Sequence, residues 1–196
     1  MTLMLIGLLL FLGTHSVRIV AEPWRSATRE RIGPLAWRGI YSVLSIAGFV
    51  AIVWGYGIAR QQPVVLWEPP LAMRHIAALL TLVAFVLLAA AYVPGNAIKA
   101  RLGHPMAAGV KIWAFAHLLA NGTLADVLLF GGFLAWAVVD RISVKRRAAA
   151  GLLRSPPALP GSTANDAIAL VGGLVVYLLF VFWAHAWLFG VRPMGG

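Results

Sequence analysis

The stretch His104-Pro-Met-Ala-Ala-Gly-Val-Lys-Ile-Trp-Ala-Phe-Ala-His-Leu-Leu-Ala-Asn-Gly-Thr-Leu-Ala-Asp126 places two histidines, a lysine and a turn sequence in an apolar background. Pro105 is typical of a helix start, since the N–H that proline lacks has no partner there. Asn121-Gly122 favours a left-handed closing conformation. Thr123 then stands three residues before Asp126, which is the spacing of a capping box. The stretch therefore predicts a tight hairpin of two helices.

The composition is that of an integral membrane protein. Apolar residues make up 61% of the 196 residues, charged ones 11%, and the mean hydropathy is +0.88. The net charge of +10 does not indicate a nucleic-acid partner, because the sixteen Lys and Arg fall between apolar runs. Cysteine is absent, which excludes disulfides, iron–sulfur clusters and covalently attached haem.

Six apolar runs predict an all-α, polytopic transmembrane bundle that forms a single domain over 1–196. The predicted spans are 3–20, 37–59, 71–93, 105–121, 124–141 and 167–190. We expect loops at 18–38 and 94–103, and a mobile cytoplasmic loop at 143–166. With the N-terminus outside, twelve Lys and Arg lie in inner segments and three in outer ones, so both termini are predicted to be outside.

Ionisable groups at membrane depth are the candidate functional residues, because a partnerless charge there is costly. His117 is the strongest candidate, and Trp113 lies one turn before it on the same helix face. A structural histidine that bonds a neighbouring helix is the alternative interpretation. The weaker candidates are His15, His75, His185 and His104, for which an interfacial or helix-capping role stays open, while Arg18 and Arg74 are expected to be interface anchors.

The chain contains several distinctive motifs, which are Thr14-His15-Ser16-Val17-Arg18, Arg38 and Tyr41, Gly103-His104-Pro105-Met106, Gly109 to Gly122, and Trp136 to Arg141. Together with Ala184-His185 of the last span, they resemble the NnrU family, and the resemblance covers about residues 1–147. The family takes its name from genes needed in bacterial nitrite and nitric oxide reduction, and its plant relative, zeta-carotene isomerase, holds haem b through histidines. The resemblance implies that His15 and His117 occupy the proposed haem-ligand positions and that His75 and His104 match other histidines of that enzyme.

The depth of the histidines in the membrane and the resemblance to the NnrU family favour different residues as the second metal ligand beside His117. His75, His117 and His185 each lie four or five residues from an outer helix end, about 6 to 8 Å deep, whereas His15 lies about 18 Å deep. Depth therefore favours His75 or His185 as the second metal ligand. We expect His15 to be the second ligand beside His117, because helix tilt and a submerged turn can compensate for the difference in depth. Trp113 is also expected to contact the cofactor.

These observations predict a bacterial inner-membrane protein that binds haem b without a covalent link. An iron atom held by two imidazoles suits electron transfer, and loss of one imidazole opens a site for nitric oxide or a polyene double bond. The predicted function is linked to denitrification or to the redox-gated isomerisation of a lipophilic polyene. The alternative is a non-catalytic accessory factor of the nitrite or nitric oxide reductase machinery, so whether the protein is an enzyme stays open.

Two other classes are less favoured. The chain distantly resembles the isoprenylcysteine carboxyl methyltransferases, but residues 140–160 are basic and lack the acidic, aromatic segment that helps those enzymes bind S-adenosylmethionine. A transporter is disfavoured because no predicted span is interrupted by a mid-membrane proline or carries an acidic residue at its centre.

Overall fold

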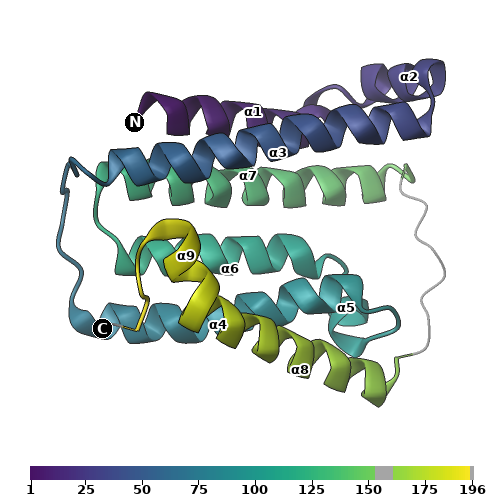
Figure 1. Cartoon of the computed structure of the whole chain (residues 1–196). Helices are drawn as coiled ribbons and strands as arrows, with labels where there is room; N and C mark the ends of the chain where they lie inside the picture. The colour runs from purple at the N-terminus through teal and green to yellow at the C-terminus, as the bar shows by residue number, and fades with distance from the viewer. Residues whose placement is uncertain (153–160, 195–196) are drawn as a thin grey trace. The chain divides into compact units, whose positions relative to one another are not determined.

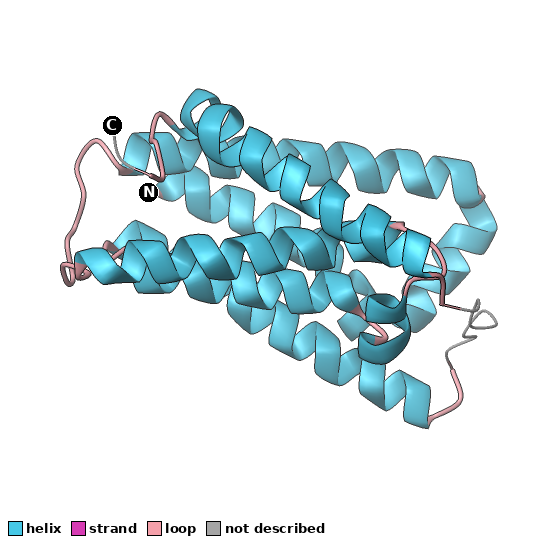
Figure 2. Ribbon diagram, turned by 90° about the horizontal axis from the view of Figure 1, so that it is seen from below, coloured by secondary structure: helices cyan, strands magenta, loops and turns pink. Residues whose placement is uncertain are grey.

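The computed structural model describes residues 1–152 and 161–194, and these residues are almost entirely helical (Figures 1 and 2). The chain divides into two compact units, Met1–Val64 and Val65–Gly196. The first unit contains α1 (Thr2–Val20), α2 (Glu22–Ile32) and α3 (Pro34–Ala59). The second contains α4 (Leu71–Tyr92), α5 (Ala97–Leu102), α6 (Pro105–Ala120), α7 (Leu124–Ala149), α8 (Thr163–Leu179), the π-helical segment η1 (Phe180–Ala184) and α9 (His185–Phe189).

Five helical segments are long and apolar enough to cross a membrane: α1, α3, α4, α7 and the continuous run Thr163–Phe189. Within the structure, 17% to 22% of the most apolar window of each segment is buried, so most residues of these apolar windows keep some exposed surface. This is the arrangement that a lipid environment requires, and it confirms a multi-pass, all-helical membrane protein. α6 has 16 residues and is therefore about 24 Å long, shorter than the about 30 Å hydrocarbon core. Six spans with both termini outside stay a prediction.

The predicted loop at 18–38 was wrong, because most of it forms α2. Pro23 stands in the first turn of this helix, where proline is tolerated. Glu22 lies 3.5 Å from Arg18 and 3.2 Å from Arg25, and these ion pairs support the junction with α1. Gly33, with φ of 85°, then ends α2 and lets α3 begin at Pro34, three residues before the predicted span start.

Two further predicted loops contain helix. Part of 94–103 forms α5, whose first turn is capped by Asn96, since its side chain accepts a hydrogen bond of 2.7 Å from Lys99 N. α7 continues through Lys145-Arg146-Arg147 to Ala149, because these residues favour helix, so it extends well beyond the predicted end at 141. Residues 153–160 of the predicted mobile loop lie outside the described part of the chain.

Within the first unit, glycines bring α1 and α3 into backbone contact. A Cβ atom at Gly7 would lie 2.6 Å from Ile52 N, and one at Gly48 would lie 2.8 Å from Phe11 N. Real side chains do not pack at such distances, so these two glycines are required for the close approach. At Gly13, by contrast, no atom lies within 4 Å of the Cβ position, so close packing does not require glycine there.

Within the second unit, α4 packs against both α6 and α8, and α6 packs against α7. The start of α8 is tied to the segment after α4, because Ala97 N donates to Asp166 Oδ1 at 2.6 Å and Ser162 N donates to Gly95 O at 2.9 Å. α8 therefore runs antiparallel to α4, and its far end, α9, lies away from α5 (Figure 1). This arrangement places His185 towards the end of the unit at which α4 begins.

The turn between α6 and α7 confirms one prediction and corrects another. The capping box is present, with Thr123 N and Oγ1 donating to Asp126 Oδ2 at 2.9 and 2.6 Å. The left-handed conformation predicted for Asn121-Gly122 is wrong: Asn121 is extended and Gly122 has no positive φ. Gly122 is required for a different reason, because a Cβ there would collide with Trp67 O. Tertiary packing of the preceding loop, including the Val65–Thr123 bridge, sets this turn.

Candidate functional site

His117 lies in an aromatic cluster formed by α6 and α7. Its ring centroid is 5.0 Å from that of Trp113, one turn earlier, and 4.6 Å from that of Phe130 across the hairpin. Trp113 in turn contacts Phe130 and Phe133 edge to face, at 5.2 and 5.4 Å. The prediction that Trp113 and His117 share a helix face is confirmed, and the hairpin gives both residues aromatic neighbours from α7.

A backbone carbonyl sets the tautomer of His117. Its Nδ1 lies 2.8 Å from Trp113 O, and a carbonyl oxygen only accepts hydrogen bonds, so Nδ1 carries the hydrogen. In the neutral ring the lone pair is then on Nε2. Histidines that bind metals are usually held in this way, with one nitrogen on a carbonyl or carboxylate and the other directed at the metal. The hydrogen bond of His117 to Trp113 O is thus compatible with metal binding through Nε2.

His15 has a similar local environment in the first unit. Its Nδ1 lies 2.7 Å from Phe11 O, one turn earlier on α1. Its ring stacks on Phe11 at 4.2 Å and meets Tyr41 of α3 at 5.2 Å, edge to face. His15 and His117 belong to different units, so their pairing at one iron atom stays a prediction.

His185 is the first residue of α9, directly after the π-helical segment. Its Nδ1 lies 2.7 Å from Val191 O, and its ring contacts Phe180 and Phe189 at 5.9 and 5.1 Å. Gly190, with φ of 67°, ends the helix and lets Val191 return to this position. π-helical turns occur frequently at functional sites, because the altered hydrogen bonding re-aims the residues that follow. No sequence pattern predicted this segment.

The remaining histidines are exposed. His75 is exposed in the first turns of α4. His104 precedes α6 as its N-cap residue but makes no side-chain capping bond. His104 has an exposed surface, but neighbouring atoms displace part of the water around its ring, and this desolvation lowers its pKa below 6.5. Arg141 and Arg147 lower the pKa further, while Asp140 opposes them. His104 is thus held towards its neutral form at the end of the second unit that lies away from the α6–α7 turn.

Within the second unit, the structure brings His117 and Trp113 together, whereas His185 contacts Phe180 and Phe189. Sequence analysis did not identify Phe130. Counting outward from the Asn121-Gly122 turn would have placed it beside Trp113, one turn before His117, because residues at similar distances from a tight hairpin turn face each other. In the described ranges, no group of three or more His, Cys, Asp or Glu is arranged to hold a metal ion.

A family model described as NnrU protein matches residues 3–193. The chain belongs to the NnrU family. The match to this family covers both compact units and extends through η1 and α9, well beyond the part that carries the sequence resemblance at 1–147. Comparisons with curated proteins and with solved structures give no match.

Membership of the NnrU family places all five histidines inside the matched region. His185 is therefore part of the family domain and not of an added tail. The same holds for the aromatic cluster around His117, which comes from two helices of the second unit. The candidate site therefore lies within the family domain.

Proposed function

We propose that this NnrU family protein binds haem b and that His117 is one of its axial ligands. The observation that carries the proposal is the 2.8 Å contact between His117 Nδ1 and Trp113 O inside the aromatic cluster. This contact directs the Nε2 lone pair outward from the backbone, as iron coordination requires. A haem needs at most two protein ligands, so a site with few metal-binding side chains is compatible with it.

The surroundings of His117 suit a flat, apolar macrocycle. Trp113, Phe130 and Phe133 supply aromatic surface, and their rings meet at centroid distances of 5.2 and 5.4 Å. Aromatic rings favour offset and edge-to-face contacts, so they can wall a macrocycle without polar groups. The Nδ1 bond to Trp113 O also makes His117 a better electron donor to a metal, because it stabilises positive charge on the ring. These side chains would hold the macrocycle and exclude water from it.

We further propose that the protein works in the inner membrane of a bacterium, in a redox step linked to nitrite or nitric oxide reduction. A bound haem with two imidazoles would supply one-electron transfer. Family membership supports this role through the genes that give the family its name. Redox-gated isomerisation of a lipophilic polyene is the catalytic alternative. For both roles, the resemblance proposes His15 as the second ligand.

Exchange of His117 for glycine tests the proposal, since it removes the imidazole and leaves space for an added one. Purified His117→Gly should lose the low-spin Soret spectrum of the wild type, and millimolar imidazole should restore it. His75→Gly is the matched control, because His75 belongs to the same unit but is exposed. If His117→Gly keeps the wild-type spectrum without imidazole, His117 is not a ligand and the proposal is wrong.

A further inference from the structure

The polar helix α2 is held at the membrane surface by the two helices that flank it. α1 has 19 residues and is therefore about 28 Å long, close to the thickness of the hydrocarbon core, which is about 30 Å. Only Ala21 separates α1 from α2, and only Gly33 separates α2 from α3. α2 packs on both helices at one end of the first unit (Figure 1). Because α1 crosses the whole core, α2 lies at the level of the lipid headgroups.

One side of α2 is engaged in contacts within the first unit. The carboxylate of Glu22 lies 3.5 Å from Arg18 and 3.2 Å from Arg25. It also accepts a hydrogen bond of 3.2 Å from the Ser26 hydroxyl. The guanidinium of Arg25 lies over the ring of Trp37, 5.8 Å from its centroid. The charges of Arg18 and Arg25 are therefore already used inside the protein.

The rest of α2 presents an exposed tryptophan and two arginines without an ion pair. Trp24 is 58% exposed, although its ring meets that of Trp37 edge to face at 6.1 Å. Arg31 is exposed and comes seven residues after Trp24, about two turns, so both lie on one helix face. Arg29 is exposed as well, and neither arginine forms an ion pair with a described residue. Glu30 is the one exposed acidic residue of α2, so the exposed charge of this helix is net positive.

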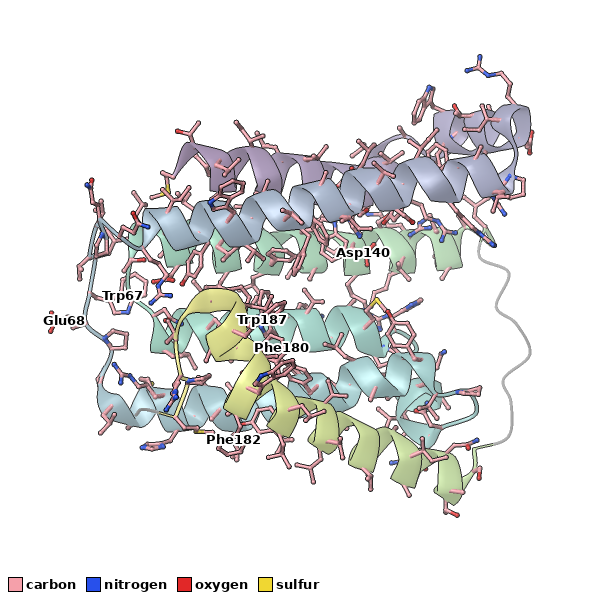
Figure 3. The ribbon with its side chains drawn as sticks, viewed as in Figure 1. Trp67, Glu68, Asp140, Phe180, Phe182 and Trp187 are labelled. Carbon is pink, nitrogen blue, oxygen red and sulfur yellow. The ribbon has the colours of Figure 1, made fainter. Side chains whose placement is uncertain are left out.

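An exposed aromatic ring alone does not indicate a headgroup site. Phe182 and Trp187 of the second unit are 71% and 73% exposed (Figure 3). The run Thr163–Phe189 that carries them contains no Lys or Arg, so it suits the hydrocarbon core. At α2, by contrast, the exposed ring is combined with arginines, and Leu35 near the start of α3 is 81% exposed. Aromatic, aliphatic and arginine side chains at one level are typical of a surface that lies in the lipid interface.

We propose that Trp24, Arg29 and Arg31 form a binding surface, the α2 surface, for the phosphate group of an anionic phospholipid. Each guanidinium presents a fork of N–H donors that matches phosphate oxygens. Trp24 supplies an amphipathic ring at the boundary between headgroups and acyl chains. The positive charge of the α2 surface favours an acidic occupant, and its place at headgroup level favours a lipid over an acidic protein, because lipid phosphates are always present there. The inference is independent of haem binding.

The test measures lipid binding to the full-length protein in detergent by native mass spectrometry, with phosphatidylglycerol and phosphatidylcholine. The wild type should bind phosphatidylglycerol more tightly. A basic residue near an anionic lipid surface contributes about fivefold in affinity, so Arg29→Gln/Arg31→Gln should weaken phosphatidylglycerol binding by about fivefold to 25-fold and leave phosphatidylcholine binding unchanged. Arg60→Gln is the matched control and should bind both lipids as the wild type does, because Arg60 is also exposed and lies over an aromatic ring, that of Tyr56, at the other end of α3.

A charge-preserving variant separates lipid binding from a folding defect. Arg29→Lys/Arg31→Lys should recover the preference for phosphatidylglycerol, and both double variants should melt as the wild type does, because glutamine and lysine favour helix about as well as arginine. Equal binding of the two lipids by the wild type, or wild-type affinity of the glutamine variant for phosphatidylglycerol, would overturn the inference. Displacement of the lipid by soluble polyglutamate at equal charge concentration would also overturn it, because the α2 surface would then bind any acidic chain.

Discussion

The contact between α4 and α8 gives a sharp stability prediction, because it rests on a single glycine. A Cβ atom at Gly173 would lie 2.6 Å from Val86 Cα and 2.9 Å from Val86 N. Both are backbone atoms, so in Gly173→Ala the helices must separate by about 1 Å to reach the ordinary contact distance of about 3.5 Å. Such overpacking costs about 1–3 kcal/mol.

Gly172→Ala is the matched control, since the Cβ position of Gly172 has no atom within 4 Å. Alanine favours helix over glycine by about 1 kcal/mol at either position, so this gain cancels when the two variants are compared. In a chain of this length 1 kcal/mol shifts the melting temperature by about 2–4 °C, so Gly173→Ala should melt about 2–12 °C below Gly172→Ala.

The assay is thermal unfolding of the detergent-solubilised variants, followed by loss of the helical circular dichroism signal. The comparison should be made in one detergent, with both variants purified in the same way. Equal melting temperatures for Gly172→Ala and Gly173→Ala would refute the close backbone contact.

Three further predictions concern the turn, the topology and pH. Thr123→Ala removes the capping hydroxyl and should cost about 1 kcal/mol of stability, whereas Thr123→Ser should melt near the wild type; equal melting of the two would exclude the cap. Reporter fusions after Arg147 should be cytoplasmic and those after Gly196 periplasmic, and fusions on the same side would contradict six spans. Desolvation lowers the pKa of His104 below 6.5, so the folded state binds its proton less strongly than the unfolded state and stability should fall as pH drops below that value. His104→Gln should reduce this fall in melting temperature, and an unchanged pH dependence would exclude His104 as its source.

Hydropathy predicted the apolar cores of the long helices, because lipid leaves little choice but helix for such runs. It failed at α2, α5 and the end of α7, which are short or carry several charged residues. These segments are helical through capping and ion pairs, as at Asn96 and Glu22, which an apolar window does not detect. Local sequence patterns correctly predicted features that depend on neighbouring residues alone, such as the Thr123–Asp126 capping box.

Gly122 is a residue whose role depends on a tertiary contact that the local sequence pattern does not predict. The sequence predicted that this turn position requires glycine, but it predicted a left-handed backbone conformation as the reason. The actual requirement comes from the carbonyl of Trp67, a residue far away in the sequence. A contact of this kind depends on how the loop before α4 returns over the hairpin, and no pattern around residue 122 encodes that path.

The site was partly predictable. The Trp113–His117 pair follows from helical spacing. The π-helical segment before His185 was not predictable, because it depends on how Phe180 packs against Phe85. The pairing of His15 with His117 stays a prediction, since the two residues belong to different units.

The most direct test of the central claim is the absorption spectrum of the wild-type protein, purified in detergent from haem-replete cells. We predict a Soret band that sharpens and shifts on reduction with dithionite, with about one haem b per chain by the pyridine haemochrome assay. A colourless protein, or a band that follows free haem and is lost on gel filtration, would contradict haem binding at His117.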